Sequence, residues 1–328
     1  MQVNGNGVLV VTQKFDPHVD RVLPILKRRG MPFFRLNTDD FHAEYVVSTS
    51  ADLGAVRVRD VWGRAVTFPD DVAAVWYRKP VPPAAPVAVT DVEAVRVVAA
   101  EVTEFLASLW SWPVARWVND PARNERAARK LPQLGLASRL GLRVPRSLVT
   151  NDPVEARAFV AGLPGAAACK SLKAYGYRDG EDERFIFARR VEATGFAAEA
   201  EAVAHCPTLL QEYVEKDHEL RVTIIGERSF CCRIDSQGTG EARTDWRRAD
   251  PFDLPHRIVP LDATVERALR GMLEAHGLAY GAFDLIVTPQ GEIVFLELNP
   301  NGQWLWIEMI TEAPMAEAMA DLLGGSGP

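Results

Sequence analysis

Hydrophobic and polar residues change their spacing along the chain, and each spacing predicts a different element. Val8 to Val11 and Phe33 to Leu36 are short β-branched or aromatic runs of the kind that form strands. Between them, Asp16 followed by Pro17 is typical of a helix start, and Gly30 after a basic turn is typical of its end. This order predicts two parallel strands joined by a crossover helix.

The pattern then predicts further strands and one long helix. Residues 45–68 favour a pair of antiparallel strands, and Ala74 to Tyr77 favours another strand before a proline-rich segment. Thr90 followed by Glu93 has the spacing of a capping box, and hydrophobic residues recur at helical spacing from there to Leu109. The first part of the chain is therefore predicted to be an α/β domain.

The pattern changes again after the long helix. Pro132 interrupts a helical pattern that starts at Asp120, so Lys130 is expected at a helix end or in a bend between two short helices. Strands then outnumber helices. We therefore place a domain boundary here, with an N-terminal α/β domain over residues 1–118 and an α+β remainder over residues 119–328.

The remainder is predicted to consist mainly of strands. A helix that starts at Asp152 precedes five of them, at residues 167–172, 184–191, 209–214, 220–225 and 230–236. Gly226 and Glu227 favour a tight turn between the last two strands. A helix from Asp262 to His276 and a hairpin from Phe283 to Asn299 follow.

The hairpin carries two carboxylates and an amide in otherwise apolar strands. If Gln290 and Gly291 form a two-residue loop, Asp284 lies directly opposite Glu297, and Asn299 points to the same face. Buried oxygens of this kind are costly without a cation, and a hard divalent ion fits them. A three-residue loop with a bulge at Gly291 would instead slip the register and separate the acids. Acids that are solvated at a sheet edge or paired with arginine are the alternative to a metal site.

Composition narrows the class of protein. The chain has 328 residues, 48% hydrophobic and 25% charged, which is globular composition. Its net charge of −7 gives no general attraction to nucleic acid or anionic membranes. The four cysteines lack metal-binding spacing, and neither a signal peptide nor a membrane-spanning run is evident, so we expect a cytoplasmic protein with reduced cysteines.

Lysine is scarce in this chain. There are seven lysines against thirty arginines, so a lysine at a chemically useful place is informative. Lys170 interrupts an apolar strand, and Lys130 lies at the predicted helix break. Taken alone, each could be an ordinary surface lysine whose ammonium reaches water. Together, and beside a carboxylate metal site, the two lysines could instead hold a nucleotide polyphosphate.

The order of these features resembles that of the ATP-grasp carboxylate ligase superfamily. The matching features follow one another as Lys130, Lys170, residues 210–214, residues 219–222, Asp284 and residues 297–302. Other segments are similar to the microviridin-type graspetide synthetases, namely residues 75–80, 142–153, 233–237 and 244–247. Those enzymes are ribosomal-peptide maturases that form side-chain ester or amide macrocycles. The resemblance implies α/β and α+β architecture, with an ATP-grasp fold behind an N-terminal pre-ATP-grasp α/β domain.

The resemblance also implies binding roles for single residues. Lys130 and Lys170 match the phosphate-binding lysines. The adenine-binding hinge is matched by Gln211, Glu212, Tyr213 and Val214. The ribose contact is matched by Glu219 or Glu215, and the Mg²⁺ ligands are matched by Asp284, Glu297 and Asn299. One departure is the loop after Lys170, which has a single glycine where many relatives are glycine-rich.

The implied activity is an ATP-dependent peptide macrocyclase that uses ATP and Mg²⁺. It would phosphorylate Asp or Glu side chains of a precursor peptide to acyl-phosphates and join them to Ser or Thr hydroxyls or Lys amines. Arg233 matches an arginine near the transferred phosphate, and Arg221 matches a second one that faces the acyl-phosphate. Asp235 and Asp245 are possible bases for a hydroxyl, or else ordinary acids paired with nearby arginines.

Two other functions remain open from the sequence. One is an ATP-grasp carboxylate–amine ligase for free amino acids or small carboxylates, and the other is a nucleotide-binding scaffold without turnover. The expected partner is a ribosomally made precursor with a leader and a core rich in Thr, Asp and Glu, and the resemblance also implies a homodimer. Nucleic acid and membrane partners are not expected, because the net charge is −7.

Overall fold

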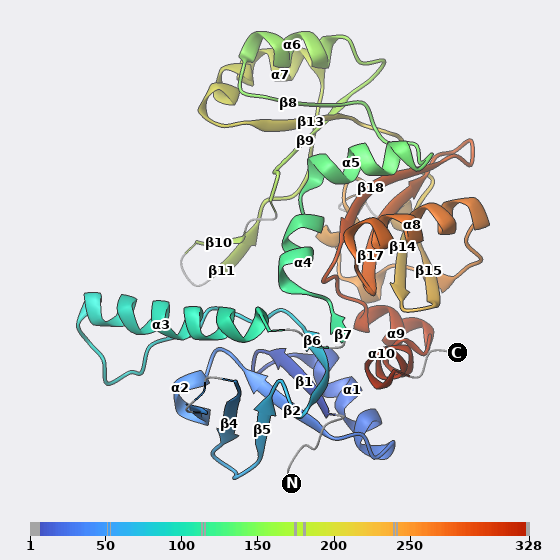
Figure 1. The fold of residues 1–328 in the computed structure, drawn as a ribbon. Coiled ribbons are helices and arrows are strands. Elements are labelled where there is room, and N and C mark those ends of the chain that lie inside the picture. The colour runs from blue at the N-terminus through green and yellow to red at the C-terminus, as the bar shows by residue number, and fades with distance from the viewer. Residues whose placement is uncertain are drawn as a thin grey trace.

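A computed structural model describes residues 7–325, apart from 51, 53, 113, 115, 174–175, 180–181, 239 and 241. For residues 176–179 and 182–185 only the strand assignment is described. Figure 1 shows three parts: an N-terminal domain, a lobe at the opposite end of the molecule, and a C-terminal sheet with its helices between them.

The N-terminal domain is built on a parallel sheet. Its four strands run in the order β2-β1-β6-β7. Their bounds are Gly7–Thr12 for β1, Phe33–Asn37 for β2, Val72–Tyr77 for β6 and Arg116–Val118 for β7. The predicted strand–helix–strand start is confirmed, because β1 pairs with β2 in parallel across the helix α1 (Pro17–Arg28). Asp16 caps α1 by accepting from the backbone amides of His18 and Val19.

A second, antiparallel sheet belongs to the same domain. Residues 45–68 form three strands rather than the predicted pair, because a turn after Asp60 adds one more. These are β3 (Tyr45–Thr49), β4 (Val56–Asp60) and β5 (Ala65–Phe68), preceded by the short helix α2 (Phe41–Glu44). Buried side chains of both sheets meet in one core that includes Leu9, Val58 and Leu106.

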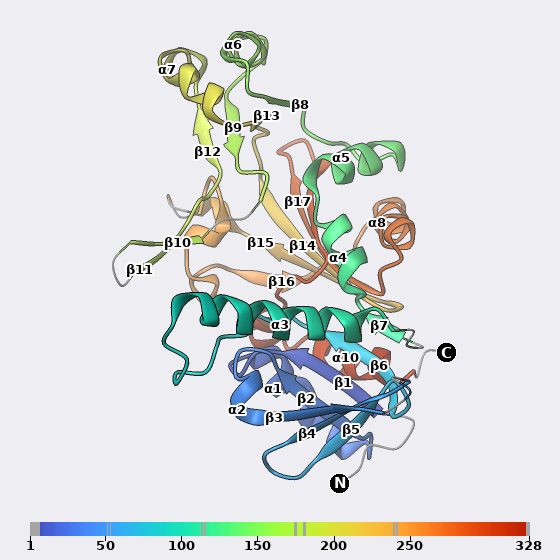
Figure 2. The ribbon, with the colours of Figure 1, turned by 60° about the vertical axis from the view of Figure 1, so that its left-hand side comes forward.

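The long helix α3 (Val92–Trp110) projects from this domain, as Figures 1 and 2 show. The predicted capping box at Thr90 is wrong by one residue. Asp91 is the N-cap, and its carboxylate accepts from the backbone amide of Ala94. An ionised carboxylate accepts this bond at least as well as a hydroxyl, so the helix starts one residue later than predicted.

The lobe at the far end is an antiparallel sheet in the order β12-β9-β13-β8. Its strands are β8 (Ser147–Thr150), β9 (Ala167–Lys170), β12 (Arg189–Val191) and β13 (Thr208–Glu212). The helices α6 (Pro153–Ala161) and α7 (Ala193–Glu199) pack on this sheet through buried side chains. Residues 184–191, predicted as one strand, are divided between a separate hairpin, β10 (Gly176–Asp179) with β11 (Asp182–Phe185), and β12.

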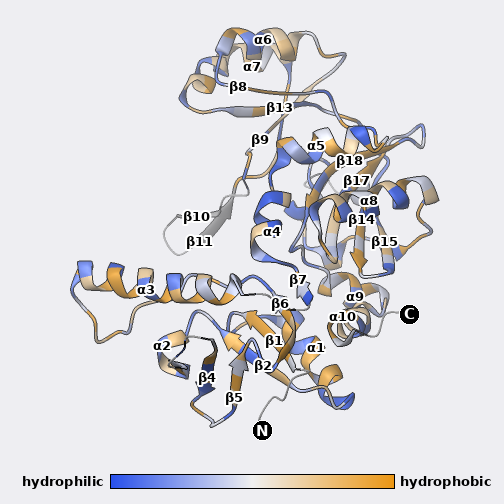
Figure 3. Ribbon diagram, viewed as in Figure 1, coloured by the Kyte–Doolittle hydropathy of each residue, from blue (hydrophilic) through white to orange (hydrophobic). Residues whose placement is uncertain are grey.

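The C-terminal sheet runs in the order β16-β15-β14-β17-β18. The bounds are His218–Ile225 for β14, Arg228–Ile234 for β15, His256–Ile258 for β16, Tyr280–Val287 for β17 and Ile293–Asn299 for β18. The helices α5 (Lys130–Arg139) and α8 (Ala263–His276) cover one face of it with leucines and one methionine, and α4 (Pro121–Ala127) leads into α5. Figure 3 shows that α4 is mostly hydrophilic, whereas β17 carries hydrophobic residues.

The end of the chain returns to the N-terminal domain. The sequence pattern did not predict the helices α9 (Leu305–Thr311) and α10 (Met315–Gly324). Helix α10 packs against α1, and α9 packs against α10. One core joins Val19 of α1 to Trp304 and Met315. This packing fixes the C-terminal sheet against the carboxyl ends of the N-terminal strands. Within the described ranges, no helix is both long and apolar enough to span a bilayer.

Candidate active site

The two hairpin acids face each other, but not for the reason that the sequence suggested. Gly291 has a φ of +84° and closes a three-residue loop, since the amide of Thr288 donates to the carbonyl of Glu292. That loop gives the slipped register near the turn, where Leu285 pairs with Phe295. A bulge between Asp284 and Leu285 in the pairing then restores the alignment, so Asp284 lies opposite Glu297.

These acids lie on the face of the sheet that the helices leave uncovered. Cross-strand neighbours share a face, so Arg221, Asp284 and Glu297 lie together, opposite the face to which Leu220 and Phe283 contribute core side chains. The Arg221 guanidinium donates to Asp284 Oδ1 over 2.8 Å. This pair is buried on both sides.

A second arginine joins the two acids. Arg247 lies in the short 3₁₀ turn Trp246–Arg248, and its Nη2 donates to Glu297 Oε1 over 2.7 Å and to Asp284 Oδ2. The Asn299 amide also reaches both carboxylates, over 3.1 Å to Asp284 and 3.3 Å to Glu297. The guanidinium of Arg247 therefore occupies the position between the acids that a cation would take.

The charge state of Glu297 reflects this crowding. Burial alone would raise its pKa, but Arg247, Lys130 and Lys170 outweigh burial and lower the pKa of Glu297 well below its usual range. Burial works against the charged form of Arg247, yet Asp284 and Glu297 raise the pKa of Arg247 above its usual value. Both groups stay ionised at neutral pH.

Lys130 reaches this pair of acids from the first turn of α5. Its ammonium donates to the Ser171 carbonyl over 3.0 Å and lies 3.5 Å from Glu297 Oε2. Gln133, one turn later, fixes α5 to the edge strand. Its amide donates to the Leu298 carbonyl over 2.8 Å and accepts from the Leu298 amide over 2.9 Å. The helix break at Pro132 thus places a lysine beside the acids.

Lys170 ends β9 and enters the same space from the far lobe. Among the residues that the structure describes, no hydrogen-bond or ion-pair partner contacts its ammonium. The pKa of Lys170 is lowered to about 8, chiefly by burial and also by Lys130 and Arg247, while Glu297 and Asp245 oppose the decrease. We call the assembly the charged cluster: Lys130, Lys170, Arg221, Asp245, Arg247, Asp284, Glu297 and Asn299.

Four side chains hold the loop that follows β18, one on each successive carbonyl. The Pro300 carbonyl accepts from Asn119 over 2.9 Å, and the Asn301 carbonyl accepts from Arg78 over 2.9 Å. The Gly302 carbonyl accepts from the Tyr280 hydroxyl over 2.5 Å, and the Gln303 carbonyl accepts from Arg221 over 3.1 Å. Because these four bonds fix the loop, Asn299 at its start and Arg221, which binds it, are held in fixed positions.

The predicted hinge residues lie at the end of β13. Gln211 is buried, and its side chain donates to Ser147 Oγ over 2.9 Å. The Glu212 amide donates to the Arg146 carbonyl over 2.8 Å, and the Tyr213 amide donates to the Ala166 carbonyl over 3.0 Å. Half-buried Val214 follows them. The segment links the far lobe to β14, as a hinge would.

The two predicted ribose contacts differ in environment. Glu215 is exposed and lies 3.7 Å from Arg190. Glu219 is buried beside Lys216, whose ammonium donates to Glu219 Oε1, while Glu219 Oε2 is buried without a partner among the described residues. Burial raises the pKa of Glu219, and Lys216 opposes that shift. A buried acceptor without a donor suits a ribose hydroxyl, so the geometry favours Glu219.

The remaining predicted catalytic residues separate into two groups. Asp245 lies with the charged cluster, where its carboxylate caps the turn that carries Arg247. Arg233 pairs with Leu220 across the sheet and so lies on the opposite face from Asp284. Arg233 donates to Asp235 over 2.6 Å, and Arg257 donates to the same carboxylate over 3.1 Å. The structure therefore does not bring Arg233 and Asp235 to the cluster.

Comparison with known proteins agrees with the resemblance to ATP-grasp ligases. Residues 7–125 match the family model described as the MvdD pre-ATP grasp domain. A RiPP-associated ATP-grasp ligase from Chryseobacterium gregarium, in complex with ADP and a leader and core peptide, is 26% identical. It covers 98% of each chain with a TM-score of 0.91. Macrocyclase MdnC from Microcystis aeruginosa, bound with its precursor peptide MdnA, is 27% identical over 97% of this chain and 99% of its own, with a TM-score of 0.84.

A third structure decides the family. Macrocyclase MdnB from Microcystis aeruginosa is 30% identical over 97% of this chain and 99% of its own, with a TM-score of 0.77. The chain belongs to the microviridin-type family of ATP-grasp ligases. The predicted ATP-grasp fold with a pre-ATP-grasp domain is confirmed, and the protein is an ATP-dependent ligase. A search of curated proteins found no match.

The charged cluster of this microviridin-type ligase fits a nucleotide and a divalent ion by its chemistry. Asp284 and Glu297 face each other across one shared cation, and the Lys170 ammonium and Glu219 Oε2 lack partners within the described part of the chain. Those residues contain no group of three or more His, Cys, Asp and Glu side chains placed for a metal. Mg²⁺ commonly takes one or two carboxylates and completes its shell with phosphate oxygens and water, which matches this donor set.

Sequence reasoning missed one central residue of the ligase. The sequence pattern assigns no role to Arg247, because Arg247 lies in a loop whose course no periodicity predicts. A signal was nevertheless present. Asp245 followed by Trp246 predicts a capped turn next to a buried aromatic side chain, and such a turn holds Arg247 in a fixed position.

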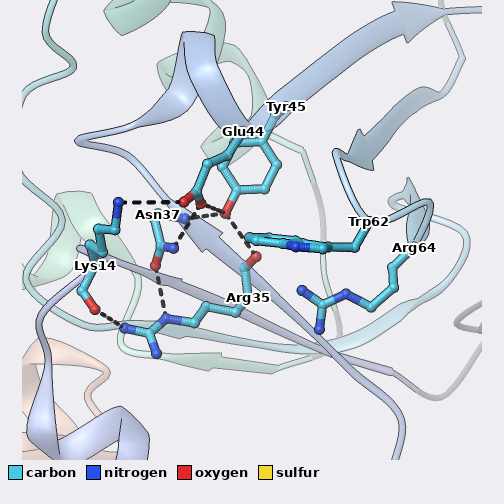
Figure 4. A pocket seen from close by; sticks show the side chains of 7 residues that line it. All are labelled: Lys14, Arg35, Asn37, Glu44, Tyr45, Trp62 and Arg64. Carbon is cyan, nitrogen blue, oxygen red and sulfur yellow. Dashed lines mark hydrogen bonds and ion pairs between the residues drawn. The ribbon is translucent and has the colours of Figure 1, made fainter.

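A pocket of about 370 Å³ lies elsewhere in this ligase, in the N-terminal domain. It is lined by Lys14, Arg35, Asn37, Glu44, Tyr45, Trp62 and Arg64 (Figure 4). We call it the N-terminal pocket. Each of its three cations has a carboxylate within 2.7 Å, at Asp40, Asp20 and Asp60 respectively. Because these charges are already paired, we do not assign the ligase chemistry to this pocket.

Proposed function

We propose that the protein is a peptide macrocyclase that acts on a ribosomally made precursor. An Asp or Glu side chain of the precursor accepts the γ-phosphoryl group of ATP, which gives an acyl-phosphate and ADP. A Ser or Thr hydroxyl, or a Lys amine, of the same peptide then attacks the activated carbonyl, and phosphate leaves. The product is an ester or amide macrocycle. The observation that carries the proposal is the charged cluster, in which Lys130 and Lys170 approach Asp284 and Glu297 from separate elements.

The residues of the chain have distinct tasks in this proposal. Lys130 and Lys170 would neutralise the phosphates, and Glu219 would accept a ribose hydroxyl. Mg²⁺ would be held by Asp284, Glu297 and Asn299 and would screen the charge that moves during phosphoryl transfer. Arg247 and Arg221 would face the phosphoryl group, since both already contact Asp284. Positioning and charge neutralisation would supply most of the catalysis.

The base that assists a hydroxyl attack would be Asp245 rather than Asp235. Asp245 caps the turn of Arg247 and is near enough to Lys170 to affect its pKa. Asp235 is held by Arg233 and Arg257 at the edge of the sheet. A carboxylate bound by two guanidiniums away from the cluster is badly placed to take a proton.

The wider context completes the proposal. The partner would be a precursor with a leader and a core rich in Thr, Asp and Glu; solved relatives hold such leader, core or precursor peptides. We propose a cytoplasmic homodimer without nucleic acid or membrane partners. The two-domain division at residues 1–118 and 119–328 is part of the same proposal, supported by the family match over residues 7–125.

The test is turnover with the peptide encoded beside the gene for this chain. Incubation with ATP and Mg²⁺ should lower the peptide mass by one water for each ring and release one ADP for each ring. The Lys130→Ala protein, checked for folding by circular dichroism, serves as the inactive control. An unchanged mass with a verified cognate precursor would contradict the proposal. Phosphate release with free amino acids but not with acidic peptides would show a small-carboxylate ligase instead.

A further inference from the structure

Lys79 has an unusual backbone at the point where the N-terminal sheet meets the C-terminal sheet. It follows β6 and has a φ of +44°, one of two positive φ values among the described residues other than glycine. Pro80 comes next, and a residue before proline is normally extended. Such a conformation is strained and persists only where the surroundings enforce it. The backbone therefore holds the Lys79 side chain in a direction that a relaxed chain would not choose.

The ammonium of Lys79 lacks a partner in the described part of the chain, and the side chain is exposed. Its neighbours are cationic. Partial loss of water, together with Arg78 and Arg221, lowers the pKa of Lys79 to about 8, while Asp16 opposes the decrease. Arg221 is the residue that contacts Asp284 in the charged cluster. Lys79 thus lies at the edge of the proposed active site, toward the N-terminal domain.

Arg78, the residue before Lys79, is buried and fixes this part of the chain to the loop after β18. It is 2% exposed, and its Nη1 donates to the Asn301 carbonyl over 2.9 Å and to Asn301 Oδ1 over 3.1 Å. Its Nε is buried without a hydrogen-bond partner in the described ranges, and Asp16 is 3.8 Å away. Asp16 also accepts from Thr12 Oγ1 over 2.9 Å. Arg78, Lys79 and Arg221 are therefore three neighbouring cations. The carboxylates beside them, Asp16 and Asp284, each have other partners as well.

We propose that Lys79 receives a carboxylate of the acidic peptide substrate and that Arg78 positions Lys79 for it. The inference rests on the proposed function and adds a contact from the pre-ATP-grasp domain. An anion there would give the exposed ammonium a partner and would balance the excess positive charge of Arg78, Lys79 and Arg221. The phosphates of ATP already have Lys130 and Lys170 on other elements. A peptide carboxylate is the anion that remains.

The geometry also explains why this contact serves specificity. Arg78 and Arg221 bind the Asn301 and Gln303 carbonyls of the loop after Asn299, so Lys79 is linked to β18 through that loop. A carboxylate on Lys79 would orient the peptide relative to the phosphoryl acceptor. A neutral peptide would lose this contact and leave the positive charges of Arg78, Lys79 and Arg221 unbalanced.

The test is a binding cycle without turnover. The affinity of the cognate precursor for the ADP-bound protein is measured by calorimetry for wild type, Lys79→Met and Lys79→Arg. The same three proteins are also measured with a neutral precursor, whose core Asp and Glu residues are changed to Asn and Gln. We expect Lys79→Met to weaken the acidic peptide about tenfold, the weight of one charge-assisted hydrogen bond, and the neutral peptide hardly at all. Lys79→Arg should retain most of the affinity.

Two controls separate binding from folding. Lys79→Gly removes the ammonium but relieves the left-handed backbone, so it should bind like Lys79→Met while its melting temperature equals or exceeds that of wild type. Lys27→Met changes an exposed lysine of α1 and should bind like wild type. Equal affinity of Lys79→Met and wild type for the acidic peptide, or equal losses for both peptides, would overturn the inference. Absence of ring formation by wild type would instead count against the proposed function.

Discussion

The N-terminal pocket and the charged cluster contain similar groups but use them differently. The pocket is lined by lysine, arginine, glutamate and tyrosine, and each of its cations lies within 2.7 Å of a carboxylate. In the charged cluster, Lys130 lies 3.5 Å from Glu297, and Lys170 has no partner in the described part of the chain. Every cation of the pocket is paired with a carboxylate of its own domain, whereas the charged cluster holds a lysine without a partner among the described residues.

The difference follows from which elements supply the charges. The carboxylates of the pocket come from the same small domain as its cations, and Arg64 and Asp60 are only four residues apart. The charged cluster draws on α5, β9, β14, β17, β18 and a loop, so its composition depends on how three parts of the molecule meet. Cations that the fold itself does not neutralise mark a place for a ligand. Four experiments test this comparison, in order of decreasing expected effect.

The strongest test compares a lysine from each region. Lys170→Met should lower the rate of ADP formation by a factor on the order of a thousand, because a desolvated phosphate would lose a charged partner. Lys14→Met, in the N-terminal pocket, should leave that rate within a factor of about two, since surface ion pairs contribute little. Steady-state ADP release with the cognate precursor measures both. Equal losses in the two variants would show that pairing does not distinguish the regions.

The lysines of the charged cluster could be found from the sequence because their neighbours are apolar. A lysine inside Ala-Ala-Cys-Lys departs from the hydrophobic pattern, and Pro132 marks the break that exposes Lys130 at a helix start. Asp284 and Glu297 could be found for the same reason. Local pattern is sufficient where a polar residue interrupts a strand or begins a helix, since both are properties of neighbouring residues.

Other features depend on contacts that no local pattern contains. The pairing of Asp284 with Glu297 needs the bulge beside Leu285, which compensates for the three-residue loop at Gly291. Either feature alone would have separated the acids. The place of Arg233 on the opposite face follows from the β14–β15 register, which the sequence leaves open until the turn is known.

A second test concerns the loop after Asn299. A Cβ on Gly302 would come within 2.5 Å of the Ala282 Cβ and 2.6 Å of Arg221 Nη2. Arg221 can move, but Ala282 cannot, so Gly302→Ala should shift the loop and pull Arg221 from Asp284. We expect ADP formation to fall about 30-fold, with a loss of about 1–3 kcal/mol in stability from overpacking. Gly195→Ala in α7 is the control, because its added Cβ would meet nothing within 4 Å and its φ is not positive, so it should spare the rate. An intact rate in Gly302→Ala would count against the role of Arg221.

The third test uses the pKa of Lys170. Because that pKa is about 8, the ammonium loses its proton as the pH rises through 8, whereas an unfolded lysine keeps it to about 10.4. ADP affinity without metal should therefore fall about tenfold between pH 7 and pH 9, while the free protein gains stability between about pH 8 and pH 10. Lys170→Arg should flatten the affinity profile. A flat profile in wild type would show that Lys170 stays charged.

The smallest effect is expected for Arg247, whose guanidinium stands where a cation would bind. Arg247→Met leaves Asp284 and Glu297 facing each other, so the melting temperature of the free protein should fall by about 4 °C. Mg²⁺ alone should then raise the melting temperature more in the variant than in wild type, because the ion no longer competes with the guanidinium. Thermal unfolding with and without Mg²⁺ measures this difference. Equal Mg²⁺ effects in both proteins would mean that Arg247 and the ion do not share a position, and that pairing with Arg247 is a permanent feature of the site.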